Sequence, residues 1–175
     1  MTRVSGLIAI MMMLSACEAP APPLQHIAEG HQPGQEEAVL GALDRFITAV
    51  LDDDIEARTM HTPEGVTYHW RPAEGGGTQI TTGPTSRLTD PSEERGHVVR
   101  ERYWSPTVMI RGGIAVVWAP YELWIDGETL HCGITNFDFV ERDGQWLMSN
   151  AMWTVEPDAC AELRPVDSSQ LRPRD

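Results

Sequence analysis

The residues best suited to chemistry in this chain are its histidines and cysteines, with a few aromatic residues on strand-like segments. One such segment, residues 129–142, gives the same parity to four side chains, namely His131, Thr135, Phe137 and Phe139. Successive side chains of a strand point to opposite faces, so these four share one face. If the phenylalanines face the core, His131 and Thr135 are candidate polar groups of a pocket, with His131 as a catalytic base. The alternative is that His131 is hydrogen-bonded to backbone near a strand end.

Three residues from another part of the chain are further pocket candidates. Tyr68 and Trp70 alternate with polar residues in a strand-like run, and His61 precedes that run. As core aromatics, Tyr68 and Trp70 need no function, and His61 is equally consistent with the surface. The six histidines show neither an HExxH motif nor paired-ligand spacing, so we predict no metal and no cofactor.

The N-terminal segment has the features of a bacterial export signal. Arg3 provides a positive charge, and residues 4–14 form an apolar stretch that is too short to span a membrane. The stretch ends in Leu14-Ser15-Ala16-Cys17, which resembles the lipobox of bacterial lipoproteins. This resemblance implies cleavage of residues 1–16 and lipidation of Cys17, with the membrane as partner. The alternative is an ordinary signal peptide or uncleaved segment with an incidental cysteine.

The residues after the signal predict where the protein resides and how it is tethered. Residues 17–35 are rich in proline and lack apolar periodicity, which is typical of a flexible tether. The predicted location is the bacterial cell envelope. No aspartate follows Cys17, which favours the periplasmic face of the outer membrane if the source is Gram-negative.

The other two cysteines, Cys132 and Cys160, are consistent with the same compartment. Disulfides persist in oxidising spaces, so we predict a bridge between them that pins the end of the chain. Two buried thiols are the alternative, and neither residue has the spacing of a metal site. The formal net charge of −13 disfavours nucleic acid as a partner, because an acidic chain repels phosphate backbones.

The order of the predicted elements indicates an α+β fold for residues 36–160. From Glu36 to about residue 51, apolar residues recur with helical spacing, and Asp52-Asp53-Asp54 then ends this helix and caps a second, at residues 55–61. A strand is predicted at residues 66–70 and an exposed loop at residues 75–89. Four strand-like runs follow, approximately residues 100–111, 114–125, 129–142 and 145–155, separated by Gly-Gly and Asp-Gly turns. Residues 161–175 are predicted to form a disordered tail.

This pattern resembles the nuclear transport factor 2-like superfamily, and within it the SnoaL-like secreted members. The resemblance rests on the opening helix, the strand Ala115–Tyr121, the segment His131–Phe139 and the ending Asp143–Leu147. It implies a cone-shaped roll, also called cystatin-like, in which a curved antiparallel sheet holds the N-terminal helices on its concave face. Enzymes of this superfamily commonly use a buried Asp or His base with a Tyr or protonated Asp donor. That machinery has no clear match here, because Asp44 is expected to face solvent.

Three functions remain open from the sequence. The leading one is an anchored domain that binds a small apolar molecule or acts as an accessory module. The second is an isomerase, dehydratase or hydrolase with His131 as base, and a strongly shifted pKa on a pocket-lining group would favour it. The third is an envelope interaction module that forms a homodimer through the outer face of the sheet, and a large apolar patch there would favour it.

Overall fold

The computed structural model describes residues 34–90 and 96–174 of the chain and begins with the predicted helix. Helix α1 (Gln35–Leu51) carries Glu36 and Glu37 in its first turn, where carboxylates favour the positive end of the helix dipole. Its apolar stripe is buried as expected, at Val39, Leu40, Ala42, Leu43, Phe46, Ile47 and Ala49. The acidic triplet then ends the helix. Asp54 caps the following 3-10 helix η2 (Ile55–Thr59) by accepting a hydrogen bond from the Glu56 amide at 2.9 Å.

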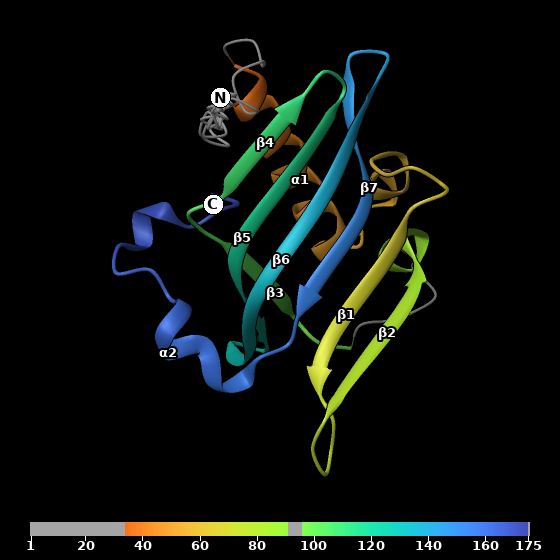
Figure 1. Cartoon of the computed structure of the whole chain (residues 1–175). Coiled ribbons are helices and arrows are strands. Elements are labelled where there is room, and N and C mark those ends of the chain that lie inside the picture. The colour runs from red at the N-terminus through yellow and green to blue at the C-terminus, as the bar shows by residue number, and fades with distance from the viewer. Residues whose placement is uncertain (1–33, 91–95, 175) are drawn as a thin grey trace, which may run out of the picture.

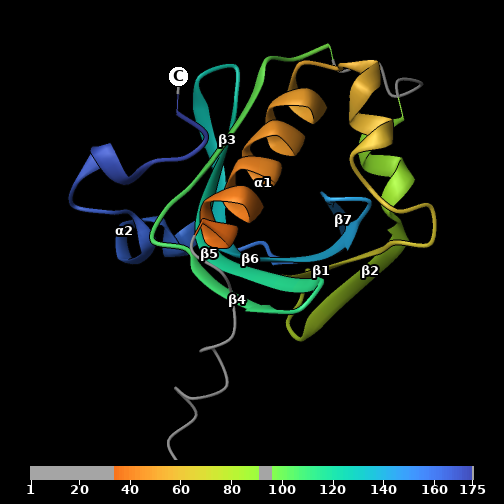
Figure 2. The same cartoon turned by 90° about the horizontal axis from the view of Figure 1, so that it is seen from above.

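Seven strands form one curved sheet, and α1 lies in its concavity (Figures 1 and 2). They are β1 (Val66–Pro72), β2 (Thr78–Pro84), β3 (Val99–Tyr103), β4 (Thr107–Arg111), β5 (Ile114–Ile125), β6 (Glu128–Arg142) and β7 (Gln145–Thr154). The order is β2-β1-β7-β6-β5-β3, with β4 also paired to β5. The architecture is therefore the predicted α+β roll.

The Asp-Gly turns join the long central strands as the sequence predicts. Asp126 and Asp143 have φ angles of 52°, and the glycine after each is also in the left-handed region. Two successive residues with positive φ match the type I′ geometry that suits a two-residue hairpin. These turns set the antiparallel pairing of β5 with β6 and of β6 with β7.

The sheet differs from the expected antiparallel meander in two places. Strand β1 runs parallel to β7, with His69 opposite Trp153, so the sheet is mixed. The run predicted as one strand at residues 100–111 is two strands, β3 and β4, and both pair with β5. The break between them falls near Ser105, whose φ angle of 45° is incompatible with a continuous strand.

The segment predicted as an exposed loop, residues 75–89, has regular structure instead. It contains the edge strand β2 and the 3-10 helix η3 (Thr85–Thr89). Thr85 is fully buried, and its amide donates to the Gly65 carbonyl at 2.9 Å. This segment is rich in Gly and Thr, a composition shared by loops and by solvent-facing edge strands, so composition alone predicted it wrongly.

The C-terminal residues, predicted to be a disordered tail, pack along the β5–β3 side of the sheet (Figure 1). After β7 the chain forms η4 (Pro157–Ala159), which precedes the predicted tail, and then α2 (Cys160–Leu163) and η5 (Ser168–Gln170). The Trp104 indole donates to the Leu163 carbonyl at 2.8 Å. Further along, the backbones of Tyr103 and Arg172 exchange hydrogen bonds. Polar composition indicated disorder, but these long-range contacts hold the segment in place.

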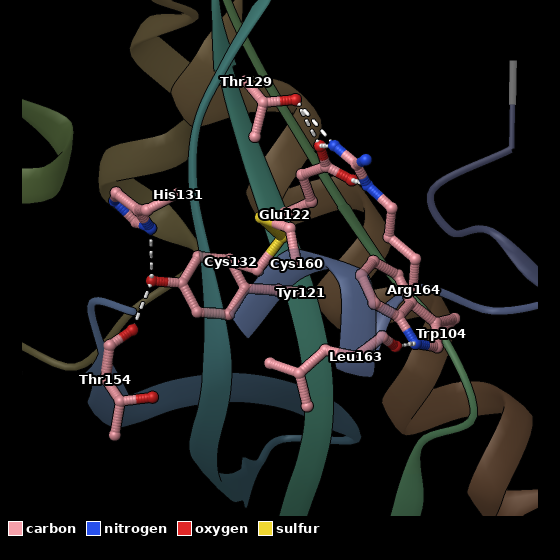
Figure 3. Close-up of a disulfide and its surroundings, with 10 residues drawn as sticks. All are labelled: Trp104, Tyr121, Glu122, Thr129, His131, Cys132, Thr154, Cys160, Leu163 and Arg164. Carbon is pink, nitrogen blue, oxygen red and sulfur yellow. Dashed lines mark hydrogen bonds and ion pairs between the residues drawn. A yellow bond between two sulfur atoms is a disulfide. The ribbon is translucent and has the colours of Figure 1, made fainter. Parts of the chain in front are cut away.

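The disulfide between Cys132 and Cys160 is present and fastens this segment to β6. Beside it, Arg164 makes two hydrogen bonds to the buried carboxylate of Glu122, and the Thr129 hydroxyl also donates to that carboxylate (Figure 3). Burial alone would raise the pKa of the Glu122 carboxyl, but these hydrogen bonds lower it below its usual range. A disulfide fits an extracytoplasmic domain.

A second contact joins the tail to the first helix through Asp44. The Tyr103 hydroxyl donates to Asp44 Oδ1 at 2.6 Å, and Arg172 Nη2 lies 2.7 Å from Asp44 Oδ2. The Arg172 side chain is only 14% exposed. Asp44 was expected to face solvent, but the returning tail covers it.

The predicted signal peptide, Cys17 and most of the tether lie outside the described residues. Within residues 34–90 and 96–174, no helix has the length and apolar character needed to cross a membrane.

Replacing both Cys132 and Cys160 with alanine should destabilise the domain. The bridge spans 28 residues, and the loop-closure model gives a loss of about 3.6 kcal/mol in the free energy of unfolding. Urea denaturation measures this, and reduction of the wild-type protein should bring it to a similar value. An unchanged unfolding midpoint in the double variant would contradict the role given to the bridge.

Arg172→Ala should also destabilise the domain, because it leaves a partly buried Asp44 carboxylate without its cationic partner. We expect a loss of about 1–3 kcal/mol by urea denaturation. Arg174→Ala is the control, since it removes the same charge from an exposed position two residues away. Equal stability of the two variants would show that the tail contributes nothing through this contact.

Candidate functional site

A cavity of about 170 Å³ lies between the C-terminal half of α1 and the concave face of the sheet. Its apolar lining is Phe46, Ile47, Val50, Leu51, Leu88, Leu123, Phe137, Ala151 and Trp153. The helix residues that border the cavity, Phe46, Ile47, Val50 and Leu51, come from the last turns of α1. Such an apolar hollow with a few convergent polar groups is the usual form of a small-molecule site.

Four polar side chains enter this cavity, namely Glu101, Tyr121, His131 and Thr135. Register explains why they meet. Glu101 pairs with Leu123, which pairs with His131, so Glu101 and His131 lie in one row across β3, β5 and β6. Residues in such a row share a face of the sheet, and here that face is concave.

Tyr121 links His131 to the end of β7 (Figure 3). Its hydroxyl donates to the Thr154 carbonyl at 2.8 Å and lies 3.3 Å from His131 Nδ1. Gly133 makes this possible, because a Cβ there would lie 2.1 Å from the same carbonyl oxygen. Since the tyrosine proton goes to Thr154, the hydroxyl accepts from a protonated Nδ1, which leaves Nε2 of His131 able to accept a proton.

The two titratable groups of the row have shifted pKa values. Burial raises the pKa of the Glu101 carboxyl to about 7, because the charged form loses water. Burial lowers the pKa of His131, because the charged form of histidine, the imidazolium cation, also loses water. Tyr121 also has a raised pKa, first through burial and then through the nearby charge of Glu101. Near neutral pH the cavity therefore holds a neutral histidine and a carboxyl that can exist in either protonation state.

The predicted pocket residues do not all lie together. His131 and Thr135 line the cavity, as strand parity predicted. Tyr68 and Trp70 do not, because Thr67 and His69 of β1 point to the concave side and Tyr68 is 44% exposed on the other. His61 lies outside the cavity, where its Nε2 is 3.1 Å from the Thr89 hydroxyl at the end of η3.

Sequence reasoning missed Glu101 and Tyr121. Glu101 stands between two arginines, a context that normally indicates a solvent-facing strand, and only the pairing of β3 with β5 turns it inward. Tyr121 could have been found, because it has the same parity as Ala115, Val117 and Ala119 along β5.

One group of side chains has the donor atoms of a metal site but not the chemistry. Within the described part of the chain, Glu122, Cys132 and Cys160 bring three ligand-type atoms within 4.8 Å of one another. The two sulfurs are bonded to each other, so neither is a thiolate, and Arg164 occupies the carboxylate. The role of this group is structural, because the disulfide and the ion pair fasten the C-terminal segment to β6 and β5.

No family model matches the chain, and no curated protein matches its sequence. Solved structures do resemble it. A protein of unknown function with a cystatin-like fold from Nostoc punctiforme has 10% sequence identity to this chain and a TM-score of 0.57. The match covers 74% of this chain and 96% of the Nostoc protein. A nuclear transport factor 2-like protein from Shewanella baltica has 15% identity and a TM-score of 0.54, with coverages of 74% and 100%.

A third neighbour is the β subunit of a putative aromatic-ring-hydroxylating dioxygenase from Novosphingobium aromaticivorans. It has 14% identity and a TM-score of 0.53, and covers 70% of this chain and 92% of its own. Identities this low establish shape and not activity. Residues 34–90 and 96–174 thus adopt the nuclear transport factor 2-like, or cystatin-like, fold.

Proposed function

We propose that this domain binds a small, mainly apolar molecule in the helix–sheet cavity and moves protons on it with Glu101 and His131. The observation that carries the proposal is that Glu101 and His131 lie in one cross-strand row and both enter the same largely apolar cavity. Burial there raises the pKa of the Glu101 carboxyl to about 7 and lowers that of His131. Strongly shifted pKa values on pocket-lining groups favour acid–base chemistry over simple binding.

The size of the cavity limits the ligand to about one ring. Its volume of about 170 Å³ is close to that of an engineered apolar cavity of roughly 150 Å³ that binds benzene. The walls from α1 and β7 are apolar, and the polar groups enter from β3, β5 and β6. A bound ring would therefore present one edge to Glu101 and His131.

The two groups suit complementary roles. A carboxyl that titrates near neutral pH is well matched to give and take protons there. His131 is oriented by Tyr121, so its Nε2 can accept a proton or, once charged, return one. The reaction class that fits is transfer of a proton next to a carbonyl group, with the Glu101 carboxylate as the base.

The outer face of the sheet supports a second proposal, that two copies of the chain associate through it. Trp118, Met152 and Tyr68 are each between 44% and 51% exposed. They lie in one cross-strand row, with Asn136 between Trp118 and Met152. Exposed apolar groups aligned in this way are typical of an interaction surface. This association leaves the concave cavity free.

We further propose that Cys17 is lipidated and tethers the domain to the cell envelope, at the periplasmic face of the outer membrane in a Gram-negative source. The lipobox-like residues and the disulfide support this proposal. Mass spectrometry of the protein from the membrane fraction tests it, since a diacylated Cys17 at the new N-terminus is the expected product.

The full chain should accelerate exchange of the hydrogens next to the carbonyl of cyclohexanone for deuterium in D2O near neutral pH. A base removes the proton, and a deuteron from solvent replaces it. Glu101→Gln should slow the catalysed exchange by about 10²–10⁴-fold. NMR spectroscopy follows the loss of the proton signal.

Glu128→Gln is the matched control for this experiment, because it removes the same charge from an exposed position on β6. It should exchange at the wild-type rate. Binding of cyclohexanone without accelerated exchange would contradict catalysis and leave only a binding role, and absence of binding would contradict both.

The raised pKa of Glu101 also predicts how stability depends on pH. Between about pH 4.5 and 7 the folded state holds a proton that the unfolded state releases, so stability falls as pH rises through this range. Glu101→Gln should therefore be more stable than wild type at pH 8, by about 3 kcal/mol.

This gain should shrink as pH falls toward 5, because the wild-type carboxyl is then protonated in the folded state. Urea denaturation of both proteins at the two pH values measures the difference, and the contribution of His131 cancels in the comparison. A gain that is the same at pH 5 and pH 8 would mean that Glu101 titrates normally.

A further inference from the structure

Thr135 lines the helix–sheet cavity at a distance from its other polar groups. Glu101 and His131 share a row across the sheet, and the Tyr121 hydroxyl lies 3.3 Å from His131 Nδ1, so these three gather at one end. Thr135 follows His131 by four residues on β6, and both line the cavity. A strand rises about 3.3 Å per residue, so the two residues lie about 13 Å apart along β6. The cavity therefore has a second polar position, at its other end.

The neighbours of Thr135 on the concave face are apolar. Thr135 pairs with Ala119 on β5 and with Trp153 on β7, and the next concave residue along β6 is Phe137. Phe137 and Trp153 also line the cavity. Valine would fill the same space as threonine at this position, so what Thr135 adds to the apolar end of the cavity is a hydroxyl that can donate and accept hydrogen bonds.

Within the part of the chain that the structure describes, the Thr135 hydroxyl makes no hydrogen bond, although the residue is only 2% exposed. Every fully shielded side-chain nitrogen or oxygen in that part has a hydrogen-bond partner, so this hydroxyl must still touch open space. For a residue as buried as Thr135, that space is the cavity that it lines. An enclosed hydroxyl without a partner costs free energy, and an oxygen atom of a bound molecule can supply the partner.

The distance between the two polar positions limits what can bridge them. Contacts of about 3 Å at each end leave about 7 Å of the separation along β6. This length suits a six-membered ring that carries an oxygen atom at each end.

We propose that Thr135 binds a second oxygen atom of the substrate, placed across the ring from the carbonyl group that faces Glu101 and His131. This inference rests on the proposed function, because the ring and its carbonyl are placed in the cavity by that proposal. The substrate class is thus a cyclic ketone with a hydroxyl or carbonyl oxygen on the far side of its ring. Thr135 makes no contact with the reacting atoms, so its role is to select and position the substrate.

The test compares two cyclohexanones substituted on the ring carbon opposite the carbonyl, one with a hydroxyl group and the other with a methyl group. The two substituents are similar in size, but only the hydroxyl group can bond to Thr135. Calorimetric titration of the full chain should show the hydroxy-substituted ketone binding about tenfold more tightly than the methyl-substituted one. Thr135→Val should lose this preference. Thr78→Val, which makes the same change at an exposed position on β2, should retain it.

The titrations separate this inference from the proposal on which it rests. If wild type binds both ketones equally, or if the preference survives in Thr135→Val, the role given to Thr135 is wrong and the cavity proposal stands. If neither ketone binds, the proposed function is wrong and the substrate class falls with it.

Urea denaturation provides a second test that needs no ligand. Thr135→Val should unfold at a midpoint no lower than that of wild type, because it keeps the shape of the side chain and removes a hydroxyl that has no partner in the protein. A clearly lower midpoint would mean that the hydroxyl already serves the fold, and it would overturn the role in substrate binding.

Discussion

The packing of α1 across the concave face of the sheet determines most of what this domain can do. Val39 and Leu43 are completely buried, so the first half of the helix is in full contact with the core. Val50 and Leu51, in its last turns, instead roof a cavity. The same contact that stabilises the fold therefore also removes water from the polar side chains beneath the end of the helix.

Desolvation beneath the helix is what shifts the pKa values of Glu101 and His131. In water a carboxyl and an imidazole differ in pKa by about two units, with the imidazole higher. Burial shifts the two in opposite directions. It raises the pKa of the Glu101 carboxyl to about 7, where the carboxyl can exchange protons near neutral pH, and it lowers the pKa of His131, which keeps the imidazole neutral there. Keeping a carboxylate in this position costs stability, and the disulfide and the returning tail stabilise the same fold elsewhere.

Local sequence patterns predicted much of the fold and part of the candidate site. The helical stripe of α1 and the Asp-Gly hairpins depend on residues close in sequence, and the Cys132–Cys160 pair was predicted from the compartment. Strand parity predicted that His131 and Thr135 face the concave side, where both line the cavity. The face of β1 could not be assigned in this way. Its alternation leaves Tyr68 exposed, and only the parallel pairing with β7 shows which side is concave.

Elements that depend on long-range contacts were not predictable from one sequence. The tail looked disordered because its composition is polar, yet Arg172 reaches Asp44 across 128 residues. The β2–η3 segment looked like a loop, and its burial depends on Thr85 fitting beside β7. Glu101 looked solvent-facing because of its charged neighbours, although three strands must assemble before its surroundings exist.

The most direct test of the account is the titration of the Glu101 carboxyl by carbon NMR spectroscopy, with Glu101→Gln to assign the signal. The account predicts a midpoint near pH 7, together with a change in that midpoint when cyclohexanone occupies the cavity. A midpoint near pH 4.5 that does not change when cyclohexanone is added would mean that the Glu101 carboxyl is solvated. That result would contradict the proposed site.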